Sequence, residues 1–169
     1  MITRVRHTGI VVQDLEKAVW FYEKLGFELW KREIESGSFL DQVVGIPEAK
    51  IETAKMKSPC GSMIELLQYH SHPKQKKIEP QPSNQLGCSH LALTVASIEN
   101  TLSTIQTAGG SLVNQPALTP SGEVQVAYCH DLEGNLLEIV EELSIVFHVG
   151  APILTLNTKE KFVQVDGLI

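Results

Sequence analysis

The chain has 169 residues, of which 43% are hydrophobic, and its formal net charge is −6. This length predicts one domain or two very small ones, with enough apolar material for a packed core. Because the chain is acidic and its one basic cluster, at 74–77, is short, we expect no nucleic-acid partner. No apolar run approaches the roughly 20 residues that span a bilayer, and the sequence shows no export signal. Three widely spaced cysteines are typical of reduced thiols, so we expect a cytoplasmic protein without a membrane partner.

An internal repeat organises the sequence. Residues 6–26 and 89–109 share one spacing, with seven positions from a histidine to a helix-capping residue and nineteen to a glycine. The matched residues are His7 and His90, Asp14 and Ser97, and Gly26 and Gly109. Each copy therefore predicts a strand, a helix capped at its N-terminus by a side-chain oxygen, and a glycine where the helix ends.

Three β-like runs follow the helix in each copy. In the first copy they are Phe27–Lys31, Lys50–Lys57 and Met63–Tyr69. In the second copy they are Ser111–Asn114, Val124–Cys129 and Leu136–Glu141. The connection 36–49 has no counterpart in the second copy, and connections of this length inside a domain are often lids or binding loops.

These elements predict an α+β fold of two βαβββ modules, residues 3–70 and 86–143. A proline-rich, mainly polar linker at 71–85 joins them, and an extension at 144–169 belongs to neither module and has no role that the sequence identifies. Strand alternation places small residues on the histidine-bearing face of each first strand and bulky residues on the other. We therefore expect a cupped mixed sheet, with the helices on its outer face and a metal site in the cavity on its inner face.

Each module also ends in a matched carboxylate. Glu65 and Glu138 each lie four residues after a glycine, inside otherwise apolar strands. An ionised carboxylate is costly to bury there unless it is paired or binds a metal. A single strand histidine is commonly a packing residue and a single strand glutamate commonly faces solvent. At matched positions of two copies, however, two histidines and two glutamates predict a site for divalent Ni, Co, Mn, Zn or Fe.

Three further side chains near these positions have simpler interpretations. We expect Tyr128 to be a core residue of its strand and His130 to be a turn residue near solvent. We expect Cys88, two residues before His90, to be a small buried thiol.

The segment from His7 to Phe27 resembles the opening motif of the vicinal oxygen chelate superfamily, which includes glyoxalase I, bleomycin resistance proteins and extradiol dioxygenases. The segment 130–138 resembles its closing motif. This resemblance implies paired βαβββ modules around a divalent metal that chelates adjacent oxygens of a small-molecule substrate. It places His7, Glu65, His90 and Glu138 at the four ligand positions of glyoxalase I. It also implies a homodimer, and it leaves open whether the four ligands come from one chain or from two.

The resemblance implies an enzyme, namely a metal-dependent lyase or isomerase that is similar to glyoxalase I or to an epimerase. Such an enzyme moves a proton through a metal-bound enediolate of a small oxo substrate, with Glu65 and Glu138 as catalytic residues, one a ligand and the other the base. Two alternatives stay open: an Fe(II) extradiol-type dioxygenase, and a metal-free small-molecule binding or resistance protein. Val11 stands where glutathione-dependent enzymes typically have arginine, and Glu65 where the epimerase typically has glutamine. The sequence therefore does not identify the substrate.

Overall fold

The computed structural model describes residues 1–73 and 79–143. The expected extension at 144–169 and the basic cluster at 74–77 lie outside these described residues. The first module contains β1 (Thr8–Val11), α1 (Leu15–Lys24), β2 (Glu28–Ser36), α2 (Ser38–Val44), β3 (Lys50–Lys57) and β4 (Met63–Tyr69). The second contains β5 (Leu91–Thr94), α3 (Ile98–Thr107), β6 (Ser111–Leu112), β7 (Ala117–Leu118), β8 (Val124–His130) and β9 (Leu136–Glu142). In the described part of the chain, no helix is both long and apolar enough to cross a membrane.

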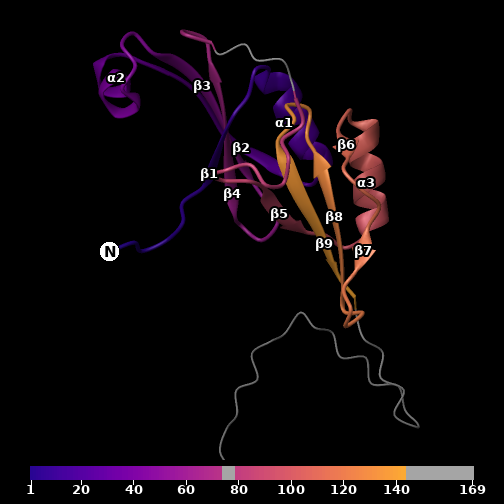
Figure 1. Cartoon of the computed structure of the whole chain (residues 1–169). Coiled ribbons are helices and arrows are strands. Elements are labelled where there is room, and N and C mark those ends of the chain that lie inside the picture. Colours follow the sequence, from indigo (N-terminus) through magenta and orange to yellow (C-terminus); the bar gives the residue numbers. More distant parts are fainter. Residues whose placement is uncertain (74–78, 144–169) are drawn as a thin grey trace, which may run out of the picture.

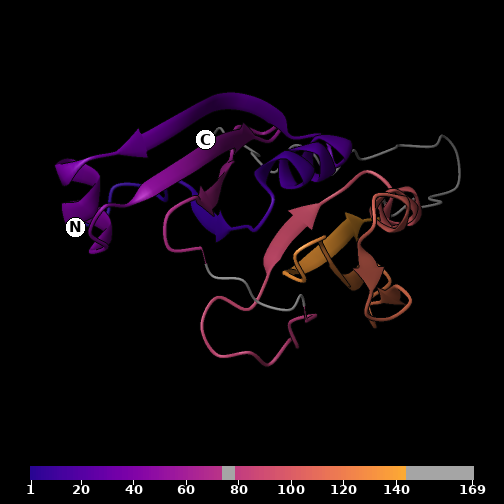
Figure 2. The same cartoon turned by 90° about the horizontal axis from the view of Figure 1, so that it is seen from above.

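The strands form two mixed sheets. The strand order is β1-β4-β3-β2 in the first module and β5-β9-β8-β6 in the second, where β7 also pairs with β8. The pairs β1/β4 and β5/β9 are parallel, and the other pairs are antiparallel. Figures 1 and 2 show the first module in indigo to magenta and the second in red to orange tones. The expected α+β fold of two βαβββ modules is confirmed, with its strands divided between two sheets.

The two long helices begin and end where the repeat predicts. The side chains of Asp14 and Ser97 accept a hydrogen bond from the backbone N–H three residues on, at 3.1 Å and 3.3 Å. Gly26 and Gly109 both have φ of +90°. Glycine adopts this left-handed conformation readily, whereas residues with a Cβ atom are strained in it. The capping and stop signals of the sequence thus fix both helices.

One hydrophobic core joins the two modules. It contains buried residues of both long helices and both sheets, among them Tyr22, Ile105 and Ile139, and the two helices contact each other. The bulky faces of the first strands pack against this core through residues such as Ile10 and Leu91, as the alternation predicted.

Polar contacts from the closing motif also connect the modules. The buried Asp131 carboxylate accepts hydrogen bonds from the Tyr22 hydroxyl on α1 at 2.9 Å and from two backbone N–H groups of its own turn. Glu133 accepts from the backbone N–H groups of Gln13 and Asp14 at 2.9 Å and 3.1 Å. Glu133 therefore attaches the second module to the residues before α1, and Asp131 attaches it to the last turn of that helix.

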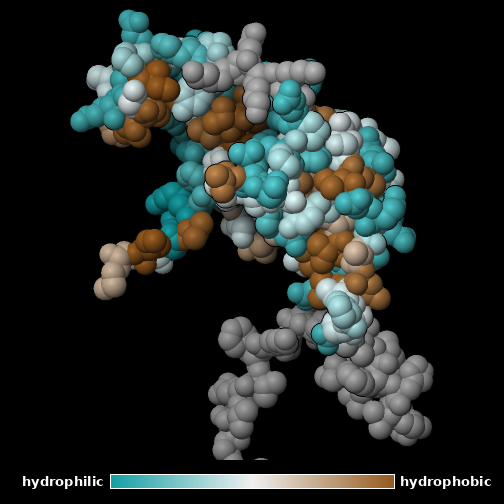
Figure 3. Space-filling model, in the orientation of Figure 1, coloured by the Kyte–Doolittle hydropathy of each residue, from teal (hydrophilic) through white to brown (hydrophobic). Residues whose placement is uncertain are grey.

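The connection 36–49 contains a short helix, α2, which the sequence did not predict. Leu40 of α2 packs with Ala49 and Ile51, whereas Phe39 and Val43 on the same helix are exposed. Figure 1 shows α2 at the far end of an arm made by β2 and β3, and Figure 3 shows hydrophobic surface on this arm. The helix has seven residues and no capping side chain at Gly37, so the usual start signals are missing.

Candidate metal centre

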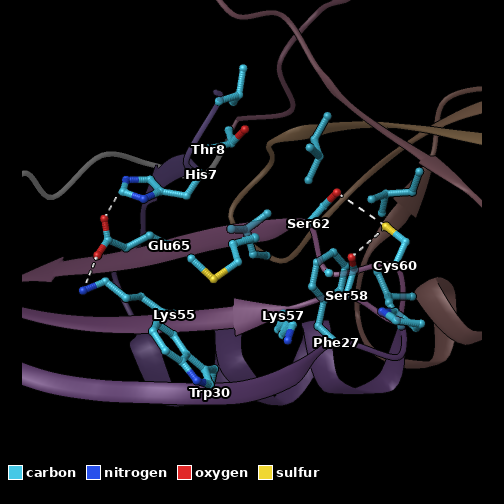
Figure 4. Close-up of a pocket in the computed structure, with 18 of the residues that line it drawn as sticks. His7, Thr8, Phe27, Trp30, Lys55, Lys57, Ser58, Cys60, Ser62 and Glu65 are labelled. Carbon is cyan, nitrogen blue, oxygen red and sulfur yellow. Dashed lines mark hydrogen bonds and ion pairs between the residues drawn. The ribbon is translucent and has the colours of Figure 1, made fainter. Parts of the chain in front are cut away.

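The first module brings His7 and Glu65 together. His7 lies just before β1, and Glu65 lies on β4 in register with Gly9. His7 Nε2 is 2.9 Å from Glu65 Oε2, and the glutamate side chain is only 12% exposed. Figure 4 shows this contact. His7 Nδ1 is buried and has no hydrogen-bond partner among the described residues. We call His7 and Glu65 the first pair.

The second module repeats this geometry with His90 and Glu138, which we call the second pair. Glu138 lies on β9 in register with Ala92. Ala92 is the second residue after His90, so the register matches that of the first pair. His90 Nε2 is 2.9 Å from Glu138 Oε2, and the glutamate side chain is 23% exposed. His90 Nδ1 lies 2.8 Å from Ser89 Oγ, a contact that orients the imidazole ring.

Both pairs have the spacing that two neighbouring ligands of one metal ion require. With metal–nitrogen and metal–oxygen bonds of roughly 2.1 Å, two ligands at a right angle lie about 3 Å apart. The observed nitrogen–oxygen distance is 2.9 Å in each pair. Imidazole and carboxylate are also ligand types that divalent transition metals accept. The donor atoms of each pair therefore fit a divalent ion.

The two pairs do not meet within one chain. Across residues 1–73 and 79–143, no three His, Cys, Asp or Glu side chains are close enough to hold a metal together. The strand faces that carry the pairs are open, because Gly9 and Val11 on β1 and Ala92 and Thr94 on β5 are exposed. The described part of a single chain thus contains two separate His–Glu pairs, each on an uncovered face.

The first pair lines an open hollow of about 1550 Å³. Its wall also contains Lys55, Lys57 and the turn 58–62 between β3 and β4. Figure 4 shows Lys55 reaching Glu65, with Lys57 and the turn farther along the hollow. Lys55 Nζ lies 3.4 Å from Glu65 Oε1. Sequence reasoning missed Lys55, although the register of the β3–β4 hairpin places it directly opposite Glu65.

Tyr128 occupies the equivalent position beside the second pair, because it lies opposite Glu138 on neighbouring strands. Its hydroxyl is 3.5 Å from Glu138 Oε2, and its ring meets the His90 ring edge-to-face at 5.4 Å. Desolvation and the nearby Glu138 carboxylate raise the pKa of Tyr128, so the phenol stays protonated and donates a hydrogen bond. The expectation of a core residue was wrong, since Tyr128 is half-buried next to the pair.

Two other expectations also need correction. His130 is buried rather than near solvent, because its Nε2 lies 2.8 Å from the backbone oxygen of Gln81, in the segment before β5. Cys88 is exposed rather than buried. These residues lie at turns and strand ends, where burial depends on segments distant in the sequence.

Comparisons with known proteins identify the family of the chain. Residues 4–139 match the family model described as the glyoxalase/bleomycin resistance protein/dioxygenase superfamily. A Synechocystis protein named as a probable lactoylglutathione lyase is 29% identical over 140 residues, which cover 82% of this chain and 95% of that protein. The Bacillus subtilis protein YurT is 29% identical over 136 residues, which cover 80% of this chain and 96% of that protein.

A solved structure has a similar fold. The crystal structure of a glyoxalase family protein from Bacillus cereus superimposes with a TM-score of 0.78 at 29% identity. The match covers 85% of this chain and 96% of that one. Both βαβββ modules are therefore part of the shared fold.

Proposed function

Because the chain belongs to the glyoxalase/bleomycin resistance protein/dioxygenase superfamily, we propose that it is a metal-dependent lyase or isomerase acting on a small oxo substrate. The observation that carries this proposal is the pair of matched His–Glu contacts, each with a nitrogen–oxygen distance of 2.9 Å. A binding protein without a metal has no need for two partly buried glutamates at equivalent positions. The relatives named as probable lactoylglutathione lyases support the same class of reaction.

In this proposal, His7 and Glu65 of one copy and His90 and Glu138 of the partner subunit hold one divalent ion, which is Ni, Co, Zn, Mn or Fe. Two observations support a site shared by two copies: the pairs are separate within the described part of one chain, and both lie on uncovered strand faces. A two-fold dimer brings the first pair of each copy to the second pair of the other, so it contains two equivalent centres.

The reaction then divides between the ion and the protein. A bound divalent ion supplies a Lewis acid that makes the hydrogen next to the substrate carbonyl more acidic. One glutamate stays a ligand, and the other takes a proton from one carbon and returns it to the neighbouring one. We assign proton transfer to Glu138, because its side chain is about twice as exposed as that of Glu65. Tyr128, which contacts Glu138, holds the carboxylate in place.

Elemental analysis of protein purified without a metal-chelating resin tests the metal. The proposal expects about one Ni, Co, Zn, Mn or Fe ion per chain, since a dimer with two centres has one centre per chain. Iron at this level, together with oxygen uptake on a catechol, would favour the dioxygenase. Protein that binds none of these ions after removal of metal by EDTA would favour the metal-free binding protein.

Glu138→Gln tests the assigned base. Glutamine keeps the shape and a ligand oxygen but cannot accept the proton, so we expect turnover to fall by about 10² to 10⁴-fold. A screen of oxoaldehyde–thiol adducts and acyl-CoA esters supplies the substrate, and calorimetry with acetohydroxamate, a small chelator with adjacent oxygens, measures binding. Retained acetohydroxamate binding with lost turnover supports the role. Unchanged turnover would contradict it.

A further inference from the structure

The two ligand pairs differ in the side chain at one equivalent position. In each module, the residue opposite the glutamate on the neighbouring antiparallel strand points toward the pair. It is Lys55 in the first module and Tyr128 in the second. A positive charge therefore stands beside the first pair, where the second pair has a neutral hydroxyl group. The repeat preserved the ligands and changed the group next to them.

The ammonium group of Lys55 lies in the wall of the hollow, between two carboxylates that it contacts at longer than the usual hydrogen-bond distance. Its side chain is 22% exposed, and its Nζ lies 3.4 Å from Glu65 Oε1 and 3.6 Å from Glu33 Oε2. Charge-assisted N–H···O bonds are typically shorter, at about 2.7–2.9 Å. Glu33 makes such a contact with Lys31 instead, at 2.7 Å. Lys55 is thus positioned by two carboxylates and keeps hydrogen-bond donors for a further acceptor.

Cations outnumber carboxylates along the wall of the hollow. The cations that line it are Arg4, Arg6, Lys31, Lys55 and Lys57, and the carboxylates among its described lining residues are Glu35 and Glu65. This local excess of positive charge occurs in a chain whose net charge is −6. A cleft lined by charges of one sign attracts ligands of the opposite sign.

We infer that Lys55 binds a negatively charged oxygen group of the substrate, a carboxylate or a phosphate, next to the oxo group at the first pair. This inference rests on the proposed function, because it concerns the substrate of the same site. It makes the substrate an acid whose charged group points toward β3, and it makes Lys55 a residue that determines specificity.

Matched chelating probes test the inference without relying on turnover. Acetohydroxamate has an uncharged methyl tail, the monohydroxamate of succinic acid has a carboxylate tail, and 2-phosphonoacetohydroxamate has a phosphonate tail. Calorimetry with the nickel-loaded protein measures the affinity of each probe. We expect at least one acidic probe to bind about tenfold more tightly than acetohydroxamate, which is the effect of one charged hydrogen bond. If the carboxylate probe gains more affinity over acetohydroxamate, the substrate group is a carboxylate. If the phosphonate probe gains more, the group is a phosphate.

Lys55→Met should remove this preference and leave nickel binding and acetohydroxamate affinity unchanged. Lys55→Arg should keep most of the preference, because it keeps the charge. Lys57→Met is the matched control, since Lys57 lies two residues along the same strand and in the same hollow. It should keep most of the preference too. Thermal unfolding confirms that each variant is folded.

Three results would overturn the inference in distinguishable ways. If the wild-type protein binds nickel, and binds the three probes with the same affinity as one another, it has no anion site and the proposed function stands. A Lys55→Met variant that loses nickel shows that Lys55 positions Glu65 for the metal rather than contacting substrate. A wild-type protein that binds neither nickel nor acetohydroxamate rejects the proposed function and the inference together.

Discussion

The two modules carry the same His–Glu pair in the same strand register, yet they differ at the sheet edge and in the side chain beside the pair. A side chain three residues beyond each glutamate binds the first backbone N–H of the module's long helix. Gln68 accepts from Leu15 N at 2.9 Å, and Glu141 accepts from Ile98 N at 2.7 Å. The shared features thus hold the pair and attach its strand to the helix.

The features that differ lie at the edge of each sheet and beside the pair. In the first module β2 has nine residues and continues into α2, whereas in the second module the edge strands β6 and β7 have two residues each. Lys55 also replaces the phenol of Tyr128. The duplicated frame thus holds the proposed metal ligands, whereas β2 and Lys55 of the first module, together with β5 of the second, line the hollow that we assign to substrate.

The largest expected effect is a loss of nickel affinity when the histidine of either pair is removed. If both pairs bind the same ion, His7→Ala and His90→Ala should each weaken nickel affinity by at least about a hundredfold. Titration of EDTA-stripped protein measures this, and His72→Ala, an exposed histidine outside both pairs, serves as control. Nickel affinity that falls in one variant and not in the other would show that the pairs do not share an ion.

A smaller effect, on the free energy of unfolding, is expected from a substitution at the contact between the modules. Asp131→Ala should lower the free energy of unfolding by about 3 kcal/mol, because it leaves the buried Tyr22 hydroxyl and two backbone N–H groups without their acceptor. Urea denaturation measures the change. Ser58 is the corresponding residue of the first module, three positions before the glycine, and it does not connect the modules. Ser58→Ala should cost less than about 0.5 kcal/mol. If both substitutions lowered the free energy of unfolding equally, the special role of Asp131 in joining the modules would be contradicted.

The helix caps should respond alike in both modules. Asp14→Ala and Ser97→Ala each remove a side-chain acceptor at the start of a long helix, and each should cost about 1 kcal/mol. The same denaturation experiment detects the loss. If only one of the two substitutions lowered the free energy of unfolding, the two helices would not be stabilised in the same way.

The smallest effect on the protein is a difference in thiol chemistry between the modules. Hydrogen bonds with Ser58 and Ser62 lower the pKa of Cys60 to about 7, whereas burial raises the pKa of Cys129 to about 12. The thiolate is the reactive form, so alkylation of Cys60 should accelerate as the pH rises and be half-maximal near pH 7. Iodoacetamide labelling followed by mass spectrometry measures this. Cys129 should stay unlabelled in the folded protein, and labelling of both at equal rates would contradict the prediction.

The sequence predicts the frame better than the surroundings of the site. Strands β3 and β4 have the predicted bounds, because apolar alternation and the intervening turn are local signals. The short helix α2 lacks a capping side chain and depends on the contact of Leu40 with Ala49 and Ile51. Lys55 is recognisable only once the hairpin register is known. The separation of the two pairs within a chain depends on how the modules pack, which no local pattern encodes.

In the proposed dimer, each metal centre takes the first pair from one chain and the second pair from its partner. Co-expression of His7→Ala and His90→Ala chains tests it most directly. In a mixed dimer, one centre then carries both substitutions and the other carries none, so random pairing should restore about a quarter of the wild-type nickel sites. Either variant alone should bind almost none. A mixture that binds no more nickel than the two separate variants would contradict the claim.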